Sequence, residues 1–233
     1  IAALSGVPVH VISVNDGLAK RNAGLFKPVF DALGVTVGLV KAGSSIDERR
    51  AAYQCDVTYC SSRQVAFDYM QDRILLNRQS GTLRLQLERL NNEGAIINAL
   101  RLRGLCYAIV DDADSILIDE SLSPLILSRS GRPASNPGEV DGDVLARTTF
   151  PRFFQRYINL CGAAANLREM KQELHTTYGL RVRAVTGRTP SRRKIAPDQV
   201  FADQSSKWQA VCESAREKFA LGQPVLVFTG SEA

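Results

Sequence analysis

The feature that most constrains the fold is a short apolar segment that ends abruptly in acidic residues. Residues 107–110 (Tyr-Ala-Ile-Val) favour strand conformation, and Asp111, Asp112 and Asp114 follow them. A short apolar run of this kind predicts a buried strand of a parallel sheet. In α/β proteins, ligands bind at the carboxyl edge of the sheet, where these carboxylates would lie. The segment therefore predicts an α/β fold with a binding site just after this strand.

Two adjacent carboxylates at this position are typical of nucleotide hydrolases. The first acid holds Mg²⁺, usually through water, and the second orients or activates the attacking water. We assign the first role to Asp111 and the second to Asp112. The local sequence is equally compatible with a structural role, in which Asp112 and Asp114 only cap a helix at residues 115–120.

Strand-like and helix-like segments alternate along much of the chain. Strands are predicted at residues 7–14, 35–40, 56–59, 124–127, 182–185 and 224–228, and helices at residues 16–33, 47–53, 61–73, 148–160, 166–178 and 205–221. Alternation at this spacing predicts a parallel sheet with helices on both faces. The aromatic residues of the 148–160 helix lie on one side of it, which favours a place in the core over a base-stacking surface.

Two segments interrupt the alternation. Residues 80–103 have helical propensity, and their arginines, including Arg101 and Arg103, are expected on a solvated face. Residues 128–143 are rich in Ser, Gly, Pro and Asp and predict a linker, or the scar of a missing insertion.

Composition excludes some classes of protein. Of the 233 residues, 45% are hydrophobic and 23% charged, as in soluble globular proteins. No apolar run approaches the ~18 residues that span a bilayer. With 2 His residues, a zinc site or a His-based triad is not expected, and the 5 Cys residues predict buried free thiols in a reducing cytosol. The net charge of +5 suits an anionic partner.

Several separated stretches together resemble one family. They are residues 9–23 (VHVISVNDGLAKRNA), 47–59, 65–72, 108–128 (AIVDDADSILIDESLSPLILS), 145–162, 186–201 and 218–231. In collinear order they resemble the SecA family, the motor ATPases of bacterial preprotein translocation. The resemblance covers nearly the whole chain apart from residues 76–100 and 129–144.

The resemblance implies a helicase-type α/β motor with ATP held between two nucleotide-binding domains. Asp111 and Asp112 match the Asp-Glu pair of the family, so they inherit Mg²⁺ coordination and water activation. Asn15 and Asp16 match an early motif of the nucleotide site, and Asp114 matches the second Asp of the acidic motif, so these three are expected to bind or sense the cofactor.

The family also implies domains, partners and a location. Residues 1–195 would form the first motor domain, with the linker 129–144 where a preprotein-binding domain inserts, and residues 196–233 would begin the second. The expected partners are unfolded preprotein, a membrane translocation channel and acidic lipid, but not nucleic acid. The expected location is the cytoplasm, at the inner face of the plasma membrane.

The chain departs from the family pattern in several places. Its phosphate loop, of the GxxxxGKT type, would precede Ile1 and is absent, which together with the missing initiator Met suggests a fragment. Such a fragment is not expected to hydrolyse ATP alone. Residues 60–64 replace a Gly-Thr-Asn-Asn-Glu run, and residues 164–166 (Ala-Ala-Asn) replace Thr-Gly-Thr. Asp112 is one methylene shorter than the Glu of the family.

These departures leave other functions open. One alternative is a pseudo-ATPase that keeps the motor fold as a binding or regulatory module. A second is a nucleic-acid helicase, which shares the two-domain motor and the acidic strand. A third is an Mg²⁺-dependent phosphohydrolase that uses Asp111, Asp112 and Asp114 without a second domain.

Overall fold

The structure, a computed structural model, describes residues 1–79, 99–128, 133–134, 144–165, 167, 169–185 and 194–228. The chain divides into two units, Ile1–Arg183 and Ala184–Ala233.

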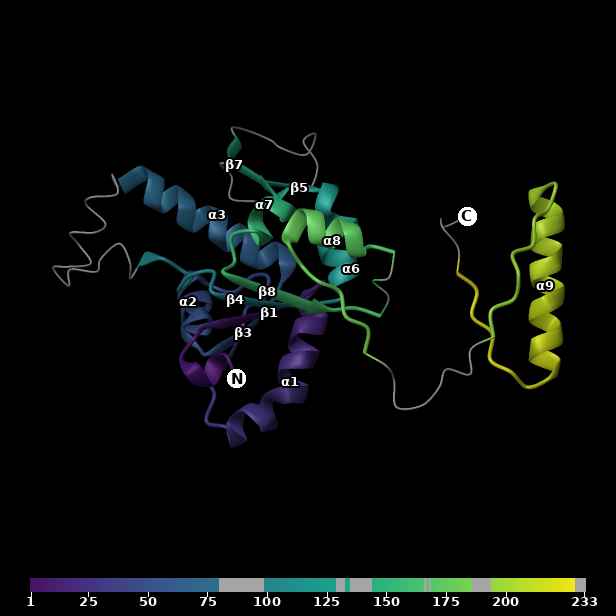
Figure 1. The fold of residues 1–233 in the computed structure, drawn as a ribbon, viewed down its shortest axis with the longest axis horizontal. Helices are drawn as coiled ribbons and strands as arrows, with labels where there is room; N and C mark the ends of the chain where they lie inside the picture. Colours follow the sequence, from purple (N-terminus) through teal and green to yellow (C-terminus); the bar gives the residue numbers. More distant parts are fainter. Residues whose placement is uncertain are drawn as a thin grey trace. The chain divides into compact units, whose positions relative to one another are not determined.

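A parallel sheet lies at the centre of the first unit (Figure 1). Its strand order is β2-β3-β1-β4-β8, and the strands are β1 (Val9–Ser13), β2 (Val37–Leu39), β3 (Val57–Ser61), β4 (Tyr107–Asp111) and β8 (Asn159–Ala163). Ile12 of β1 lies opposite Cys60 of β3 and Val110 of β4. The parallel pairing confirms the expected α/β fold and brings the carboxyl ends of the strands to one edge.

Helices cover both faces of this sheet, as predicted. They are α1 (Asp16–Ala32), α2 (Ile46–Gln54), α3 (Ser62–Gln79), α6 (Ala113–Leu117), α7 (Phe150–Phe154) and α8 (Lys171–Tyr178). Ala19 and Ala23 of α1 pack with Val9 and Val57 in one apolar cluster. A second and larger apolar cluster contains residues of α2, α3, α6, α7 and α8. Helix α1 therefore covers one face of the sheet, and these five helices cover the opposite face.

Local signals explain where α1 and α2 begin. The Asn15 side chain accepts a hydrogen bond from the amide of Leu18 and caps α1. Ser45 and Glu48 form a reciprocal capping box at the start of α2. Short 3₁₀ turns occur at η1 (Ala3–Ser5) and η2 (Asp119–Leu122).

The segment predicted as one helix over residues 148–160 is shorter and divided. Helix α7 ends at Phe154, and the chain then extends into β8, which pairs in parallel with β4. The aromatic spacing suggested a longer helix because it continues through Tyr157. The assignment of these aromatics to the core is confirmed, since Phe150, Phe153, Phe154 and Tyr157 are all buried.

Other predicted elements also differ from the structure. Residues 115–120 divide between α6 and η2, and α8 starts later than the predicted 166–178 helix. Residues 182–185 and 224–228 are extended, but they pair with no strand in the described part of the chain. The helix predicted over residues 80–103 falls largely on 80–98, outside the described residues. The cysteines are free, as expected, but only Cys60 is buried.

A smaller antiparallel sheet adjoins the larger cluster. It has the order β6-β5-β7, with strands β5 (Pro124–Ser128), β6 (Pro133–Ala134) and β7 (Val144–Thr149). Ser128 of β5 lies opposite Val144 of β7, so these two residues are neighbours in the sheet although they are far apart in the chain. The predicted 128–143 linker lies mostly outside the described residues.

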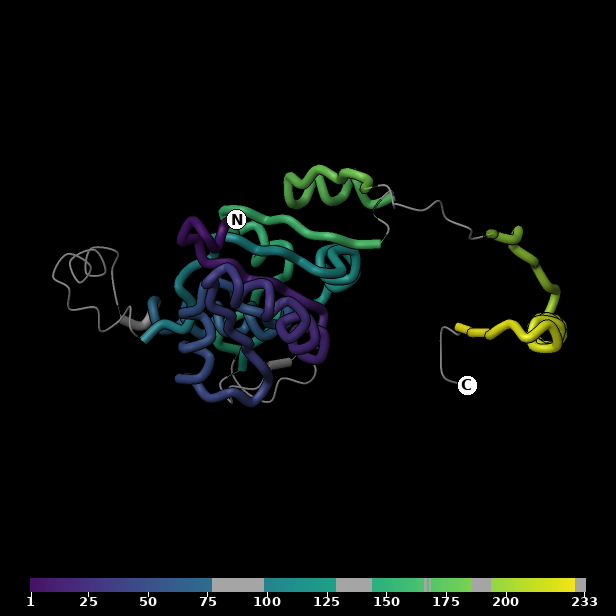
Figure 2. The backbone as a smooth tube through the Cα atoms, turned by 90° about the horizontal axis from the view of Figure 1, so that it is seen from below, coloured from purple at the N-terminus to yellow at the C-terminus, as the bar shows by residue number. Residues whose placement is uncertain are grey.

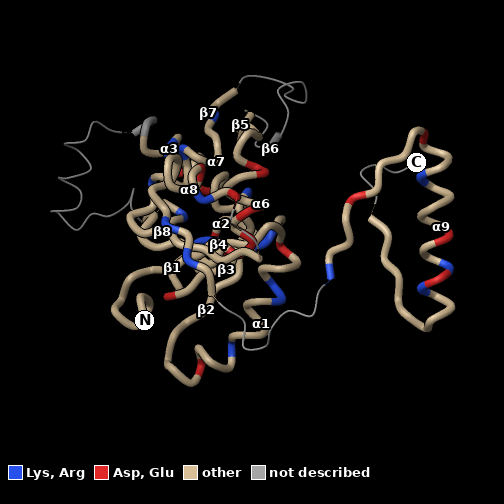
Figure 3. Tube along the Cα trace, turned by 45° about the vertical axis from the view of Figure 1, so that its right-hand side comes forward, with Lys and Arg blue, Asp and Glu red and all other residues tan. Residues whose placement is uncertain are grey.

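The second unit is built on helix α9 (Gln204–Ala220) (Figure 2). Asp203 caps this helix. Extended segments on either side of α9 place Phe201, Val225 and Val227 along an apolar groove with Val211. Acidic and basic residues alternate along this helix (Figure 3). None of the helices in the described ranges is long and apolar enough to cross a membrane.

Candidate active site

Asp111 is the last residue of β4, at the carboxyl edge of the central sheet. Side chains alternate along a strand, and Ala108 and Val110 enter the larger cluster, so Asp111 faces the α1 side. There its Oδ2 accepts a hydrogen bond of 2.8 Å from the Nδ2 amide of Asn22 in α1. Asn22 was not among the predicted site residues. The signal available was its place between Ala19 and Ala23, small residues that predict the inner face of the helix.

Asp112 follows in a left-handed backbone conformation, with φ 54° and ψ 56°. Among the described residues it is the only non-glycine with a positive φ. Such a conformation costs roughly 1–2 kcal/mol for an L-residue and is concentrated at functional sites. It turns the chain sharply from β4 into α6 and leaves Asp112 exposed at the sheet edge.

The capping role considered for Asp112 and Asp114 has limited support. Asp112 occupies the N-cap position of α6, but its side chain makes no capping hydrogen bond. Asp114 lies in the first turn of α6, where a negative charge is favoured by the helix dipole. Its backbone oxygen accepts a hydrogen bond from Ile118.

Asn15 and Asp16 lie at the same edge of the sheet, and each has a partner within the protein. Asn15 caps α1, as described above. Asp16 Oδ2 accepts a hydrogen bond of 2.6 Å from the amide of Ala42, in the loop between β2 and α2. The structure thus brings both residues to the edge that carries Asp111 and shows them organising the backbone there.

Two further side chains share the face that Asp111 occupies. Ser13, the last residue of β1, is fully buried, and its hydroxyl has no hydrogen-bond partner among the described residues. Tyr59 of β3 is also on this face. Burial raises the pKa of the Tyr59 phenol, and the nearby charge of Asp111 raises it further. The environment of Asp111 is therefore partly desolvated and contains neutral polar groups.

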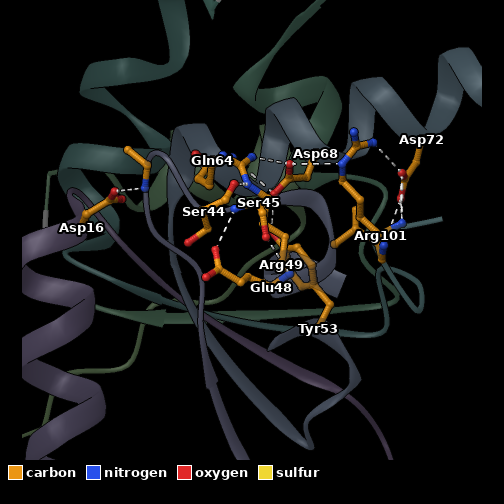
Figure 4. A network of polar contacts seen from close by, with 12 residues as sticks. Asp16, Ser44, Ser45, Glu48, Arg49, Tyr53, Gln64, Asp68, Asp72 and Arg101 are labelled. Carbon is orange, nitrogen blue, oxygen red and sulfur yellow. Dashed lines mark hydrogen bonds and ion pairs between the residues drawn. The ribbon is translucent and has the colours of Figure 1, made fainter. Parts of the chain in front are cut away.

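A buried network supports the loop that Asp16 contacts (Figure 4). Its centre is Asp68 of α3, which is fully buried. Asp68 accepts hydrogen bonds from Arg49 at 2.8 Å, from the Tyr53 hydroxyl at 2.9 Å and from Gln64 at 3.3 Å. Arg49 also donates to the backbone oxygen of Ser44. The network thus ties α2, α3 and the loop before α2 together.

Arg101 extends this network to the neighbouring Asp72 (Figure 4). Its guanidinium lies 3.3 Å from Asp72, and the Asp72 carboxylate also accepts the backbone amides of Arg101 and Leu102. Burial raises the pKa of the Asp72 carboxyl, an effect that these hydrogen bonds oppose. The Arg101 side chain is 11% exposed. The expectation that it lies on a solvated face was therefore wrong, because a buried carboxylate needs its charge.

The acidic residues at the sheet edge fit a shared magnesium ion. Oδ1 of Asp111 and the Asp112 carboxylate have no hydrogen-bond partner in the described part of the chain. Mg²⁺ is usually held by one or two carboxylates together with phosphates and water. Among the described residues no group of three His, Cys, Asp or Glu is placed to hold a metal by itself. The arrangement therefore suits an ion that a phosphate ligand would share.

Comparison with known proteins identifies the family to which this chain belongs. The sequence profile of the SecA DEAD-like domain matches residues 1–141. The chain belongs to this family. It is 30% identical to protein translocase subunit SecA 2 of Bordetella avium, in a match over 100% of this chain and 52% of that protein. It is 25% identical to protein translocase subunit SecA of a Synechococcus species, over 98% of this chain and 33% of the relative.

The chain matches only part of the length of its SecA relatives. The chain spans about half the length of the SecA 2 relative it matches. That match extends over 345 residues, whereas this chain has 233, so more than a hundred positions of the match have no counterpart here. A shorter match, to SecA of Acinetobacter baylyi, is 40% identical over 133 residues.

Proposed function

We propose that the full-length protein containing this chain is an ATP-driven motor for protein translocation. The observation that carries the proposal is the pair Asp111 and Asp112 at the carboxyl edge of β4, in a SecA DEAD-like domain. The relatives of this chain are named protein translocase subunits. We propose unfolded preprotein and a membrane translocation channel as partners, with the motor at the cytoplasmic face of the membrane.

In this proposal each acid has a distinct role. Asp111 would hold Mg²⁺ with the carboxylate oxygen that Asn22 leaves free. Asp112, in its strained turn, would orient the water for attack on the terminal phosphate of a bound ATP. The metal would supply positive charge to the phosphate oxygens. Asn15 and Asp16 shape the loops at this edge, and Asp114 lies in the first turn of α6.

The proposal extends to the organisation of the chain. We propose that residues 1–195 belong to the first motor domain and that residues 196–233 begin the second. The hairpin of β5 and β7 is where a preprotein-binding domain would attach, and the neighbouring positions of Ser128 and Val144 support this. The longer match of the SecA 2 relative agrees with an additional domain in that protein.

The test is MgATP turnover by the full-length protein. Asp111→Asn and Asp112→Asn each remove a charge but keep the size of the side chain, and Asn tolerates the left-handed conformation of Asp112. Both substitutions are expected to lower turnover by at least about 100-fold. Asp119→Asn, an exposed acid in η2, is the matched control and should turn over like wild type.

A second function, a pseudo-ATPase, is favoured by one observation. Asp112 is exposed on a strained turn and is shorter than a glutamate, so its reach toward an attacking water is reduced. In that case the wild-type protein would bind MgATP without turning it over, and Asp112→Asn would change neither property. Turnover stimulated by unfolded protein would exclude the pseudo-ATPase.

A further inference from the structure

The contact between Asn22 and Asp111 joins residues that are 89 positions apart in the chain. The amide nitrogen of Asn22 lies 2.8 Å from Oδ2 of Asp111, and both side chains are partly buried. An ionised carboxylate can only accept hydrogen bonds, so the amide group of Asn22 must present its NH₂ side to Asp111. This fixes the orientation of Asn22 and leaves one lone-pair direction of Oδ2 occupied.

The packing of helix α1 on the sheet places the Asn22 amide beside the end of β4. Ala19 and Ala23 are buried against the sheet, and Asn22 lies on the same side of the helix, three and one residues from them. Small side chains let the helix lie close to the strands, so a short Asn side chain reaches the end of β4. The N-cap Asn15 and the bond between Asp16 and Ala42 hold the start of the same helix.

The Asn22 amide is a suitable partner for a carboxylate, such as that of Asp111, that binds a metal ion. A lysine or arginine at this position would neutralise Asp111 and compete with a cation for it. An amide donates a hydrogen bond without adding charge, so the full negative charge of Asp111 remains available. Hydrogen-bond partners of this kind orient metal-binding carboxylates, and their removal typically costs about 10–100-fold in metal affinity or activity.

We propose that Asn22 is a positioning residue, which holds the Asp111 carboxylate in the orientation needed for the magnesium ion of MgATP. This inference rests on the proposed function. It adds the side chain of Asn22 to the acidic residues at the end of β4 and the start of α6.

The test uses the full-length protein and follows ATP turnover as a function of Mg²⁺ concentration at saturating ATP. Asn22→Leu has a similar size but no amide. It is expected to raise the Mg²⁺ concentration for half-maximal turnover by about 10–100-fold. Asn22→Gln keeps the amide and should recover part of this loss. Asn159→Leu makes the same change at an exposed position of β8, at the opposite end of the sheet, and should match wild type.

The thermal unfolding midpoint of each variant separates positioning from stability. A shifted Mg²⁺ requirement with a midpoint near that of wild type supports the proposal. An Asn22→Leu protein with the same Mg²⁺ requirement as wild type would overturn it. A loss of turnover that is fully explained by a lower unfolding midpoint would overturn it as well. If Asn22→Leu does not fold, Asn22→Ala is held to the same criteria. An inactive wild-type protein would overturn the proposed function, and this inference with it.

Discussion

His10 shows how a single buried side chain can make folding depend on pH. It is 2% exposed in β1, and its Nδ1 shares a hydrogen bond of 2.8 Å with the Tyr157 hydroxyl. The rings of Tyr53 and Tyr157 lie edge-on against it. Burial lowers the pKa of His10 from 6.5 to about 4, because a charged imidazole would be desolvated there.

The sign of the effect follows from this lowered pKa. Between pH 6.5 and pH 4, the unfolded chain binds a proton at His10 that the folded chain does not. The free energy of unfolding is therefore not reduced by His10 above pH 6.5. It decreases as the pH falls from 6.5 toward 4, by about 3 kcal/mol in total. Urea unfolding at several pH values measures it.

The matched variant for this measurement is His10→Gln, which can hydrogen-bond but does not titrate. Its unfolding free energy should be lower than that of wild type at pH 7, because the site is tightly packed. The difference between the two proteins should shrink as the pH falls to 5. A constant difference over this range would contradict the lowered pKa of His10.

At the scale of elements, the close approach of β8 to β4 depends on Gly162. A β-carbon added at this position would lie 2.7 Å from the backbone oxygen of Val110 and 3.0 Å from the β-carbon of Ala113. A backbone oxygen cannot move aside as a flexible side chain can, so β8 would have to shift. Since Val110 and Ala113 flank the acidic turn, the shift would also disturb Asp111 and Asp112.

Gly162→Ala is therefore expected to destabilise the protein by about 1–3 kcal/mol. Gly24→Ala is the matched control, because a β-carbon there meets no atom within 4 Å. In the interior of α1 this second substitution should stabilise the protein by up to about 1 kcal/mol. Thermal unfolding distinguishes the two, and equal effects would show that β8 can relax away from β4.

The whole first unit is held together by more than its apolar core. Asp68 accepts hydrogen bonds from Arg49, Tyr53 and Gln64. The Arg101 guanidinium lies 3.9 Å from Asp68 and 3.3 Å from Asp72, and so links the two carboxylates. These residues come from α2, α3 and the segment that leads into β4. Because Asp68 is fully buried, removing its carboxylate leaves a largely buried guanidinium and a buried hydroxyl without their partner.

Asp68→Ala should cost about 3–5 kcal/mol of unfolding free energy, as expected for breaking a buried ion pair. Asp47→Ala provides the control, because Asp47 pairs with Arg50 at the surface and its side chain is 90% exposed. Its removal should cost less than about 1 kcal/mol. Similar losses for the two variants, measured by urea unfolding, would contradict a central role of Asp68.

Local patterns in the sequence predicted much of this molecule. The helix predicted over residues 16–33 matches α1, and the position of Asp111 after a buried strand followed from its apolar neighbours. These features depend on hydrogen bonds and side-chain alternation within a few residues. Such signals are present in any short window of the chain, so a sequence reveals them directly.

Tertiary structure alone decided which distant residues meet. β8 is a strand because it pairs with β4, although the aromatic spacing before it suggested a longer helix. Arg101 is buried because Asp72 lies across from it, and Asn22 meets Asp111 because α1 packs closely on β1 and β3. The sequence by itself determined the acidic strand end and the α/β fold. The partner of Asp111 depends on how separate elements pack, which no local pattern encodes.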